Sequence, residues 1–249
     1  MSSACVLVLG GTAEARDLAA ALDRAGVSVV SSLAGRVARP RLPAGEVRIG
    51  GFGGPAGLAR WLAERGVAAV VDATHPFAER ISASAAQACP AAGVPLLRLE
   101  RPGWSEAPGD CWHWVDDLSH AAELVPRLGR RVLLTTGRQG LAAFAVVRSA
   151  WFLVRCVDPP DPPLPPRHEL LLDRGPYLLE NELALMDGKQ IDLLVTKDSG
   201  GAHTQPKLDA ARRRGLPVIV VRRPPRLDVP AVSSVAGALS WLRETVHAG

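Results

Sequence analysis

The feature that most constrains the fold of this chain is an internal repeat. Residues 66–102 match residues 188–224 without a gap when the numbering is shifted by 122 positions. Each copy has the pattern of a strand, a helix that ends at glycine and a second strand, and a strand–helix–strand unit that occurs twice predicts two related α/β halves. The identical pairs include Gly66 with Gly188, Thr74 with Thr196, Ala88 with Ala210, Gly93 with Gly215, Pro95 with Pro217, Arg101 with Arg223 and Pro102 with Pro224.

The whole chain alternates short apolar runs with helical patterns. Continuous apolar strands separated by helices are typical of a parallel sheet that is covered on both faces. We predict an α/β protein of two dinucleotide-binding-like domains with parallel sheets, at residues 1–115 and 116–249, with a ligand cleft between them. The prolines of "DPPDPPLPP", 158–166, predict an extended surface loop. We expect strands at 5–11, 27–32, 46–51, 68–74, 95–100, 130–137, 151–156, 191–197 and 217–223, and helices at 12–26, 55–66, 77–93, 177–188, 207–215 and 233–247.

Composition narrows the class of protein. Hydrophobic residues make up 47% and charged residues 22%, which is typical of a soluble globular protein. No apolar run approaches the roughly 18–20 residues of a membrane span, and the N-terminus lacks a signal-peptide pattern. Four scattered cysteines without metal-ligand spacing favour the cytoplasm and no metal. The 29 basic and 25 acidic residues permit an anionic ligand, but the single dense basic run, 211–215, does not indicate a nucleic-acid site.

The first strand ends in a glycine turn, "LGGTAEAR", at residues 9–16. Gly10 and Gly11 would let a phosphate approach the backbone, and Thr12 stands where a helix N-terminus would face that charge. The alternative is a tight turn in which Thr12 only caps the helix. The sequence leaves both interpretations open.

The end of the second strand carries hydroxyl groups and a cation where an NAD-binding chain has an acid. Ser31, Ser32 and Arg36 lie about 20 residues after Gly10. Hydroxyls and a guanidinium bind a 2′-phosphate that an acid would repel, so the pattern favours NADPH over NADH, although Arg36 could also be a solvated loop residue. The glycine cluster at 50–54 either admits a ligand or only turns the chain.

Several strands end in a threonine followed by polar or cationic groups. Thr74 and His75 follow one strand, Thr196 and Lys197 end its repeat, and Arg138 ends "TTGR". Alone, His75 fits a capping or a core histidine, and Lys197 fits a solvated charge. Because ligands of parallel sheets bind beyond the carboxyl ends of strands, the repeated pattern favours a shared anion-binding site.

Together, "LGGTAEAR", "SLAGR", "DATHPFA", "TTGR" and "TKDSGG" resemble the precorrin-6A reductase family of the cobalamin (vitamin B12) pathway over nearly the full chain. The resemblance implies two Rossmann-like domains with the ligands between them. It implies that NADPH reduces one ring double bond of precorrin-6A, a polycarboxylate tetrapyrrole, to give precorrin-6B.

The resemblance also suggests roles for individual residues. His75 and Lys197 are the candidate proton donors, with water as the alternative, and the chain is expected to be a monomer or a small homo-oligomer. The expected cofactor contacts are Gly10, Gly11, Thr12, Arg16, Ser31, Arg36 and Thr74. The expected substrate contacts are Arg138, Lys197, Ser199, Gly200, His203 and Lys207.

Other classes fit less well. A short-chain dehydrogenase needs Tyr-x-x-x-Lys, but four residues after Tyr177, the only tyrosine, stands Asn181. A methyltransferase that uses S-adenosylmethionine usually has an acid after the second strand, where this chain has serines. A non-catalytic protein that binds NADPH or a tetrapyrrole remains open.

Overall fold

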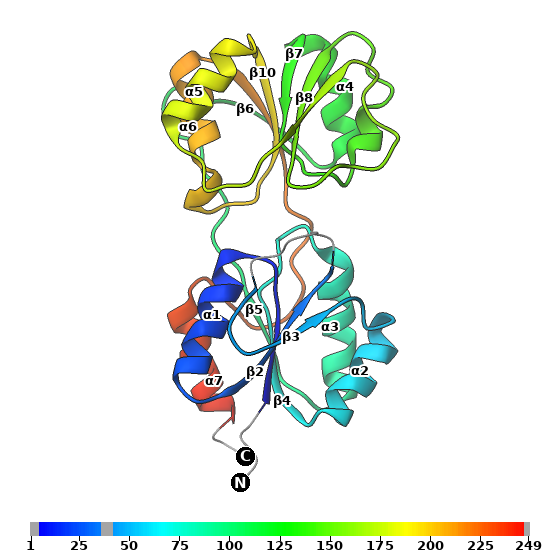
Figure 1. Ribbon diagram of the computed structural model, residues 1–249, viewed down its shortest axis with the longest axis vertical. Helices are drawn as coiled ribbons and strands as arrows, with labels where there is room; N and C mark the ends of the chain where they lie inside the picture. The colour runs from blue at the N-terminus through cyan, green and yellow to red at the C-terminus, as the bar shows by residue number, and fades with distance from the viewer. Residues whose placement is uncertain (1–4, 36–41, 247–249) are drawn as a thin grey trace. The chain divides into compact units, whose positions relative to one another are not determined.

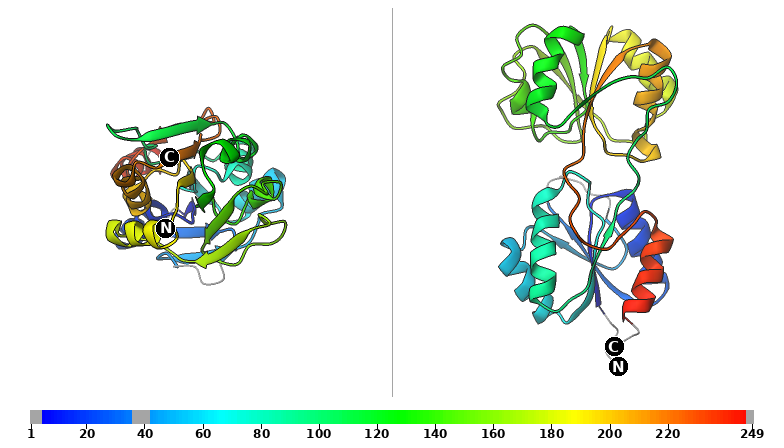
Figure 2. Two further views of the ribbon diagram at one scale, coloured as in Figure 1. Left: turned by 90° about the horizontal axis from the view of Figure 1, so that it is seen from above. Right: turned by 180° about the vertical axis from the view of Figure 1, so that it is seen from behind.

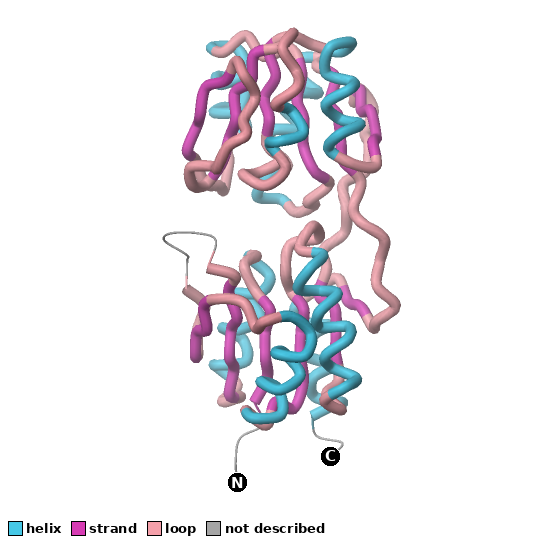
Figure 3. Tube along the Cα trace, turned by 90° about the vertical axis from the view of Figure 1, so that its right-hand side faces the viewer, coloured by secondary structure: helices cyan, strands magenta, loops and turns pink. Residues whose placement is uncertain are grey.

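The computed structural model describes residues 5–35 and 42–246. The chain forms two compact units (Figure 1). Unit 1 comprises Met1–Pro102 and Pro224–Gly249, and unit 2 comprises Gly103–Arg223. Each unit has a six-stranded sheet in which all described neighbours pair in parallel, with helices on both faces (Figure 3). The predicted fold class is confirmed.

Unit 1 has the strand order β12-β5-β4-β1-β2-β3. Helices α1 (Ala13–Arg24) and α7 (Val235–Val246) pack together on one face, and α2 (Gly54–Glu64) and α3 (Glu79–Ala91) cover the other (Figures 1 and 2). Its strands are β1 (Cys5–Leu9), β2 (Ser28–Leu33), β3 (Glu46–Ile49), β4 (Val67–Asp72), β5 (Leu96–Leu99) and β12 (Ala231–Val232).

Unit 2 has the matching order β6-β11-β10-β7-β8-β9. Helices α5 (Leu179–Gly188) and α6 (Pro206–Arg214) pack together, and α4 (Leu118–Leu128) packs with the short helix η1 (Leu141–Phe144). A second short helix, η2 (Ala202–Thr204), precedes α6. The strands are β6 (Cys111–Val115), β7 (Arg131–Leu134), β8 (Trp151–Cys156), β9 (His168–Leu172), β10 (Leu193–Lys197) and β11 (Pro217–Val221).

The two units exchange their edge strands. β6 follows β5 in the chain but pairs with β11 in unit 2, while β12 follows β11 but pairs with β5 in unit 1. The expected boundaries, 1–115 and 116–249, are therefore wrong: 103–115 belong to unit 2 and 224–249 to unit 1. Sequence periodicity identifies a strand but does not say which sheet the strand extends.

The crossings between the units fall at the Arg-Pro dipeptides that end the repeat. Arg101 forms an ion pair of 2.8 Å with Glu14 in unit 1, and Arg223 forms one of 3.2 Å with Asp198 in unit 2. Each arginine therefore anchors the chain to its unit immediately before the chain leaves that unit.

The pairing of the strands shows that the first strands of the two repeat copies are offset by two residues from the ungapped sequence match. In unit 1, Asp72 lies opposite Arg98, whereas in unit 2 Thr196 lies opposite Val220, the repeat partner of Arg98. The structural counterpart of Thr196 is thus Asp72 rather than Thr74. A shift of two residues keeps each side chain on its face of the sheet, which is why the apolar pattern still matched.

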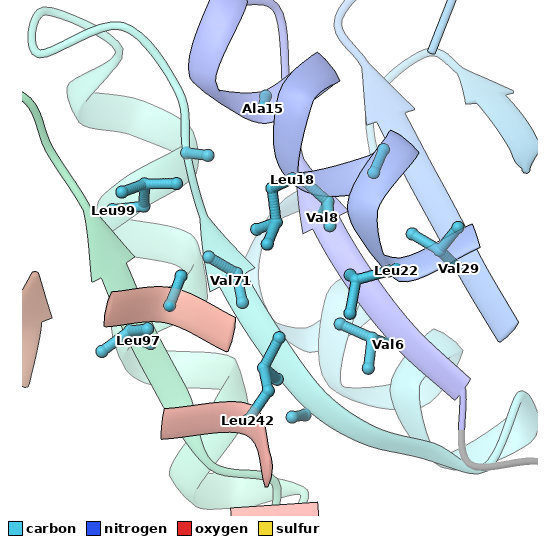
Figure 4. Packing of buried hydrophobic residues seen from close by; sticks show 14 residues of the cluster. Val6, Val8, Ala15, Leu18, Leu22, Val29, Val71, Leu97, Leu99 and Leu242 are labelled. Atoms are coloured by element: carbon cyan, nitrogen blue, oxygen red, sulfur yellow. The ribbon is translucent and has the colours of Figure 1, made fainter. Parts of the chain in front are cut away.

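The core of unit 1 shows why the C-terminal segment returns to it. Leu242 of α7 packs in one buried cluster with Val6, Leu18 and Leu97, which come from β1, α1 and β5 (Figure 4). Burying a leucine side chain contributes about 1.5–3 kcal/mol relative to leaving it in water. The apolar face of α7 therefore completes the core beneath the α1 side of the sheet.

The loop at 158–166 is irregular and mostly exposed, as its prolines predict. None of the helices in the described ranges is both long and apolar enough to cross a membrane.

Candidate functional site

Three strands of unit 1 end at the same edge of the sheet. Leu9, the last residue of β1, lies opposite Ser32 of β2 and opposite Asp72 of β4. The glycine turn after β1, the end of β2 and the Thr74 corner therefore share the carboxyl edge, where parallel sheets bind ligands.

Thr12 connects the glycine turn to the neighbouring strand end. Its hydroxyl donates to the Ala73 carbonyl at 2.7 Å and accepts from the Ala15 amide at 3.1 Å. Thr12 is thus the N-cap of α1, as one of the two interpretations predicts. Because its proton is committed to Ala73, its side chain shapes the turn rather than presenting a donor to a ligand.

The glycines of the turn have defined conformational roles. The Gly10 amide donates to the Ser32 carbonyl at 2.9 Å, which closes the turn against β2. Gly11 has a φ of 116°, a backbone conformation that residues with a Cβ rarely adopt.

A pocket adjoins this turn. It is lined by Gly10, Gly11, Ala15, Arg16, Ser31, Leu33 and Pro43. Ser31 is only 1% exposed, and its hydroxyl has no hydrogen-bond partner among the described residues. The structure thus places four expected cofactor contacts around one pocket, and the hydroxyl without a partner is suited to a polar ligand. Arg36, another of the expected cofactor contacts, lies outside the described residues.

Arg48 braces the second glycine cluster. Its guanidinium donates to the carbonyls of Gly50 at 2.6 Å and Gly51 at 2.8 Å, and it lies 3.8 Å from the centroid of the Phe52 ring. The glycine cluster at 50–54 is therefore a turn that the Arg48 side chain holds in place.

Thr74 belongs to a buried polar network. Its hydroxyl donates to the Asp72 carboxylate at 2.7 Å, and Arg98 donates to Asp72 at 2.5 Å and to Ser82 at 2.7 Å. Arg98 was not among the predicted site residues, although an arginine inside an apolar strand signals a buried partner. Since the Thr74 proton is used by Asp72, the hydroxyl could only accept a hydrogen bond from a cofactor.

His75 is half-buried beside this network. Its Nδ1 accepts from the Phe77 amide at 3.3 Å, and its carbonyl accepts from the Ala78 amide at 2.8 Å. With Nδ1 as an acceptor, a neutral His75 carries its proton on Nε2. His75 therefore does not cap α3, whose N-cap is Ala78 without a side-chain hydrogen bond, and Nε2 is the ring nitrogen that can donate.

Unit 2 presents the other predicted groups at its own carboxyl edge. Lys197, the last residue of β10, pairs with Val221 at the end of β11, and "TTGR" follows the adjacent β7. Lys197 and Arg138 are half-buried, Ser199 is buried, and His203 is exposed. Gly200, with a φ of 63°, turns the chain between Ser199 and η2. The structure thus brings five predicted substrate contacts onto one edge or the loop that follows it.

Asp198 fixes this loop. Its carboxylate accepts from the Trp104 amide at 2.9 Å and pairs with Arg223 at 3.2 Å. A side chain at position 103 would collide with that carboxylate, since a Cβ there would lie 2.5 Å from Asp198 Oδ2. Gly103 and Asp198 therefore hold Trp104 next to the "TKDSGG" loop.

Lys207, in the first turn of α6, is only 4% exposed. Its ammonium nitrogen lies 5.1 Å from the centroid of the Trp104 ring. Burial and, to a smaller extent, the Arg155 guanidinium lower the pKa of Lys207 while Glu182 opposes the shift, and together they leave it at about 7.

Arg155 and Glu182 form a buried ion pair that the sequence analysis did not find. Two guanidinium nitrogens of Arg155 donate to the two carboxylate oxygens of Glu182, at 2.5 and 3.0 Å. The guanidinium also lies 4.0 Å from the centroid of the Tyr177 ring. A charged residue inside the apolar run of β8 is the signal that sequence reasoning could have used.

Comparisons with known proteins agree with this arrangement. A model of the family described as precorrin-6x reductase CbiJ/CobK matches residues 5–243. The chain belongs to the precorrin-6x reductase family. It is 56% identical over 239 residues to the precorrin-6A reductase of Rhodococcus erythropolis, an alignment that covers 95% of this chain and 96% of the relative.

More distant relatives carry related names. A precorrin-6A reductase of Mycobacterium tuberculosis is 53% identical over 240 residues, covering 95% of this chain and 96% of that protein. A cobalt-precorrin-6A reductase of Salmonella typhimurium is 33% identical, covering 90% and 89%. A solved structure titled CobK precorrin-6A reductase superposes with a TM-score of 0.92 at 41% identity and covers 97% of both chains.

These likenesses confirm the predicted family and activity. The reductase is an oxidoreductase of cobalamin biosynthesis that acts on a precorrin, and a reductase of this kind implies a nicotinamide cofactor. They favour catalysis over the non-catalytic alternative.

Proposed function

We propose that this reductase uses NADPH to reduce one ring double bond of precorrin-6A, giving precorrin-6B. The observation that carries the choice of cofactor is the Ser31 hydroxyl, which lines the pocket of the glycine turn and has no hydrogen-bond partner among the described residues. Ser31 lies two residues before Leu33, the last residue of β2, and a dinucleotide-binding chain holds the ribose that carries the 2′-phosphate near the end of this strand.

The residues of the pocket fit a phosphorylated dinucleotide. Gly10 and Gly11 let backbone amides approach phosphate oxygens, and the N-terminus of α1 favours their negative charge. Arg16 supplies a cation on the pocket wall, and Ser31 supplies a donor. Arg36 is the further 2′-phosphate contact that the sequence predicts.

Bound NADPH would supply the hydride that adds to one carbon of the double bond. The adjacent carbon then needs a proton, for which His75 and Lys197 are our candidate donors and water is the alternative. Arg138, Lys197, Ser199, Gly200, His203 and Lys207 are the proposed substrate contacts, because cationic side chains and amides at one edge suit a polycarboxylate ring.

A binding experiment tests the choice of cofactor. Ser31→Ala should weaken NADPH binding about tenfold and NADH binding much less, because a hydrogen bond to a charged group contributes about 1.5–3 kcal/mol. Ser28→Ala, at the exposed start of the same strand, is the matched control and should change neither affinity. Equal losses for NADPH and NADH in Ser31→Ala and in Arg36→Ala would contradict the 2′-phosphate assignment.

The location of the protein in the cytoplasm and its state of assembly are two further proposals. The four cysteines are all free thiols, which fits a reducing cytoplasm. A monomer or a small homo-oligomer is the proposed state of assembly.

A further inference from the structure

Lysine is rare in this chain. Only three of its 29 basic residues are lysines: Lys189, Lys197 and Lys207. Lys189 is an exposed partner of Glu169 at 2.6 Å, and Lys197 ends β10. Lys207 is the buried one. Arginine, the usual basic residue of this chain, stays charged at any ordinary pH. At this buried position the chain instead has a lysine, whose charge can change near neutral pH.

The ammonium group of Lys207 has no hydrogen bond to the described residues around it. Within the described ranges the structure gives it the face of Trp104 but no hydrogen bond. The carboxylate that acts on Lys207, Glu182, accepts hydrogen bonds from Arg155 at both oxygens. A lysine that is only 4% exposed and whose ammonium has no hydrogen bond to the described residues lowers the stability of the fold, so stability does not account for a lysine here.

Trp104 adds a second hydrogen-bond donor without an acceptor. Its indole Nε1 is buried and has no partner among the described residues. The backbone amide of Trp104 is bound to Asp198, which ties this side chain to the "TKDSGG" loop. Two donors without acceptors thus lie beside the loop that follows β10, at the ligand edge of unit 2.

We propose that Lys207, supported by Trp104, forms a subsite that binds one carboxylate of the macrocycle through the charged ammonium. This inference rests on the proposed function, because it takes the polycarboxylate substrate from there. A carboxylate would accept the hydrogen bonds that the ammonium lacks and would compensate for its buried charge.

The subsite makes binding dependent on pH. Arg155 from β8 and Glu182 from α5 are the charged groups that act on Lys207, and with burial they leave its pKa at about 7. Below that pH the ammonium is charged and holds the carboxylate, and above it the neutral amine does not. Substrate affinity should therefore fall as the pH rises through neutrality, while bound substrate should raise the pKa of Lys207.

Equilibrium binding of precorrin-6A without NADPH tests the subsite. The wild-type affinity should fall about tenfold between about pH 6 and pH 8.5. Lys207→Met keeps the apolar stem and should bind about tenfold more weakly at about pH 6, with this pH dependence lost. Lys189→Met, at the exposed lysine, is the matched control. Wild-type affinity and slope in Lys207→Met would overturn the proposal.

A second measurement needs no variant at position 207. With ¹³C-labelled lysine the protein should give three Cε signals, which Lys189→Arg and Lys197→Arg assign by elimination. The Lys207 signal should titrate near neutral pH, and its midpoint should move upward when precorrin-6A binds. A midpoint that bound precorrin-6A leaves unchanged would overturn the subsite.

Turnover separates this inference from the proposed function. Lys207→Met should raise KM for precorrin-6A and keep kcat. An unchanged KM would contradict only the subsite, whereas a wild-type protein that oxidises no NADPH with precorrin-6A would contradict the proposed function.

Discussion

The Thr12 hydroxyl donates a hydrogen bond of 2.7 Å to the carbonyl oxygen of Ala73, 61 residues later in the chain. It joins the start of α1 to the end of β4, so one side chain sets the spacing between two loops at the ligand edge of unit 1. Thr12→Val keeps the shape but removes both the hydrogen bond and the cap. We expect it to lower the free energy of unfolding by about 1–3 kcal/mol, measured in urea.

Thr12→Ser is the matched control for this change. It retains the hydroxyl and should stay within about 1 kcal/mol of the wild-type protein. A Thr12→Val protein as stable as Thr12→Ser would show that neither hydrogen bond matters.

The buried pair of Asp72 and Arg98 provides a second prediction. Arg98→Met leaves the Asp72 carboxylate without its cation and should cost about 3–5 kcal/mol of stability. Asp72→Asn combined with Arg98→Met should cost clearly less than the sum of the two single changes. The exposed pair of Arg65 and Glu46 is the control, and Arg65→Met should cost about 1 kcal/mol or less. Additive losses at Asp72 and Arg98 would contradict the coupling.

Lys207 predicts an unusual dependence of stability on pH. Its pKa in the folded protein, about 7, lies below the ordinary lysine value of 10.5, so between these values the unfolded chain binds more protons and stability rises with pH. Below about pH 7 the amine is charged in the folded protein as well, and the burial of that charge then destabilises the fold to its full extent. Lys207→Met should therefore raise the melting temperature more at about pH 6 than at about pH 9. An equal gain at both pH values would mean that the amine is not buried as described.

The candidate proton donors can be separated by single-turnover kinetics. His75→Ala and Lys197→Ala are each expected to slow reduction of bound precorrin-6A if that residue donates the proton, by about 10²–10⁴-fold. His120→Ala, at an exposed position, and Lys189→Ala, whose side chain is 37% exposed, are the controls. Wild-type rates in both test variants would remove both residues from the chemistry and leave water as the donor.

The sequence predicted most of the regular elements because their signals are local. β1, β4 and β10 are apolar runs, and α1 begins at a capping threonine and has a clear amphipathic pattern. Four strands or α-helices were missed, as were the short helices η1 and η2. β6 and α4 lie in the stretch where the two halves join, β9 follows the proline-rich loop, and β12 has only two residues. In β6 the run "CWHWV" has a single aliphatic residue, Val115, whereas aliphatic residues mark the other strands.

The exchange of β6 and β12 could not be read from the sequence. A strand's pattern records that one face is buried, but not which of two similar sheets buries it. The same limit applies to polar partners: Arg98, Arg155 and Glu182 depend on contacts between elements far apart in the chain. By contrast, Gly10, Gly11, Arg16 and Ser31 were predicted together, because a dinucleotide turn has a fixed spacing along the chain.

Anaerobic turnover with purified components tests the central claim most directly. The protein is mixed with NADPH and precorrin-6A, and the absorbance of the reduced nicotinamide is followed beside that of the macrocycle. The account predicts that one NADPH is oxidised for each precorrin-6A reduced, with NADH much less effective at equal concentration. Binding of both ligands with no loss of nicotinamide absorbance, or equal rates with NADH, would contradict it.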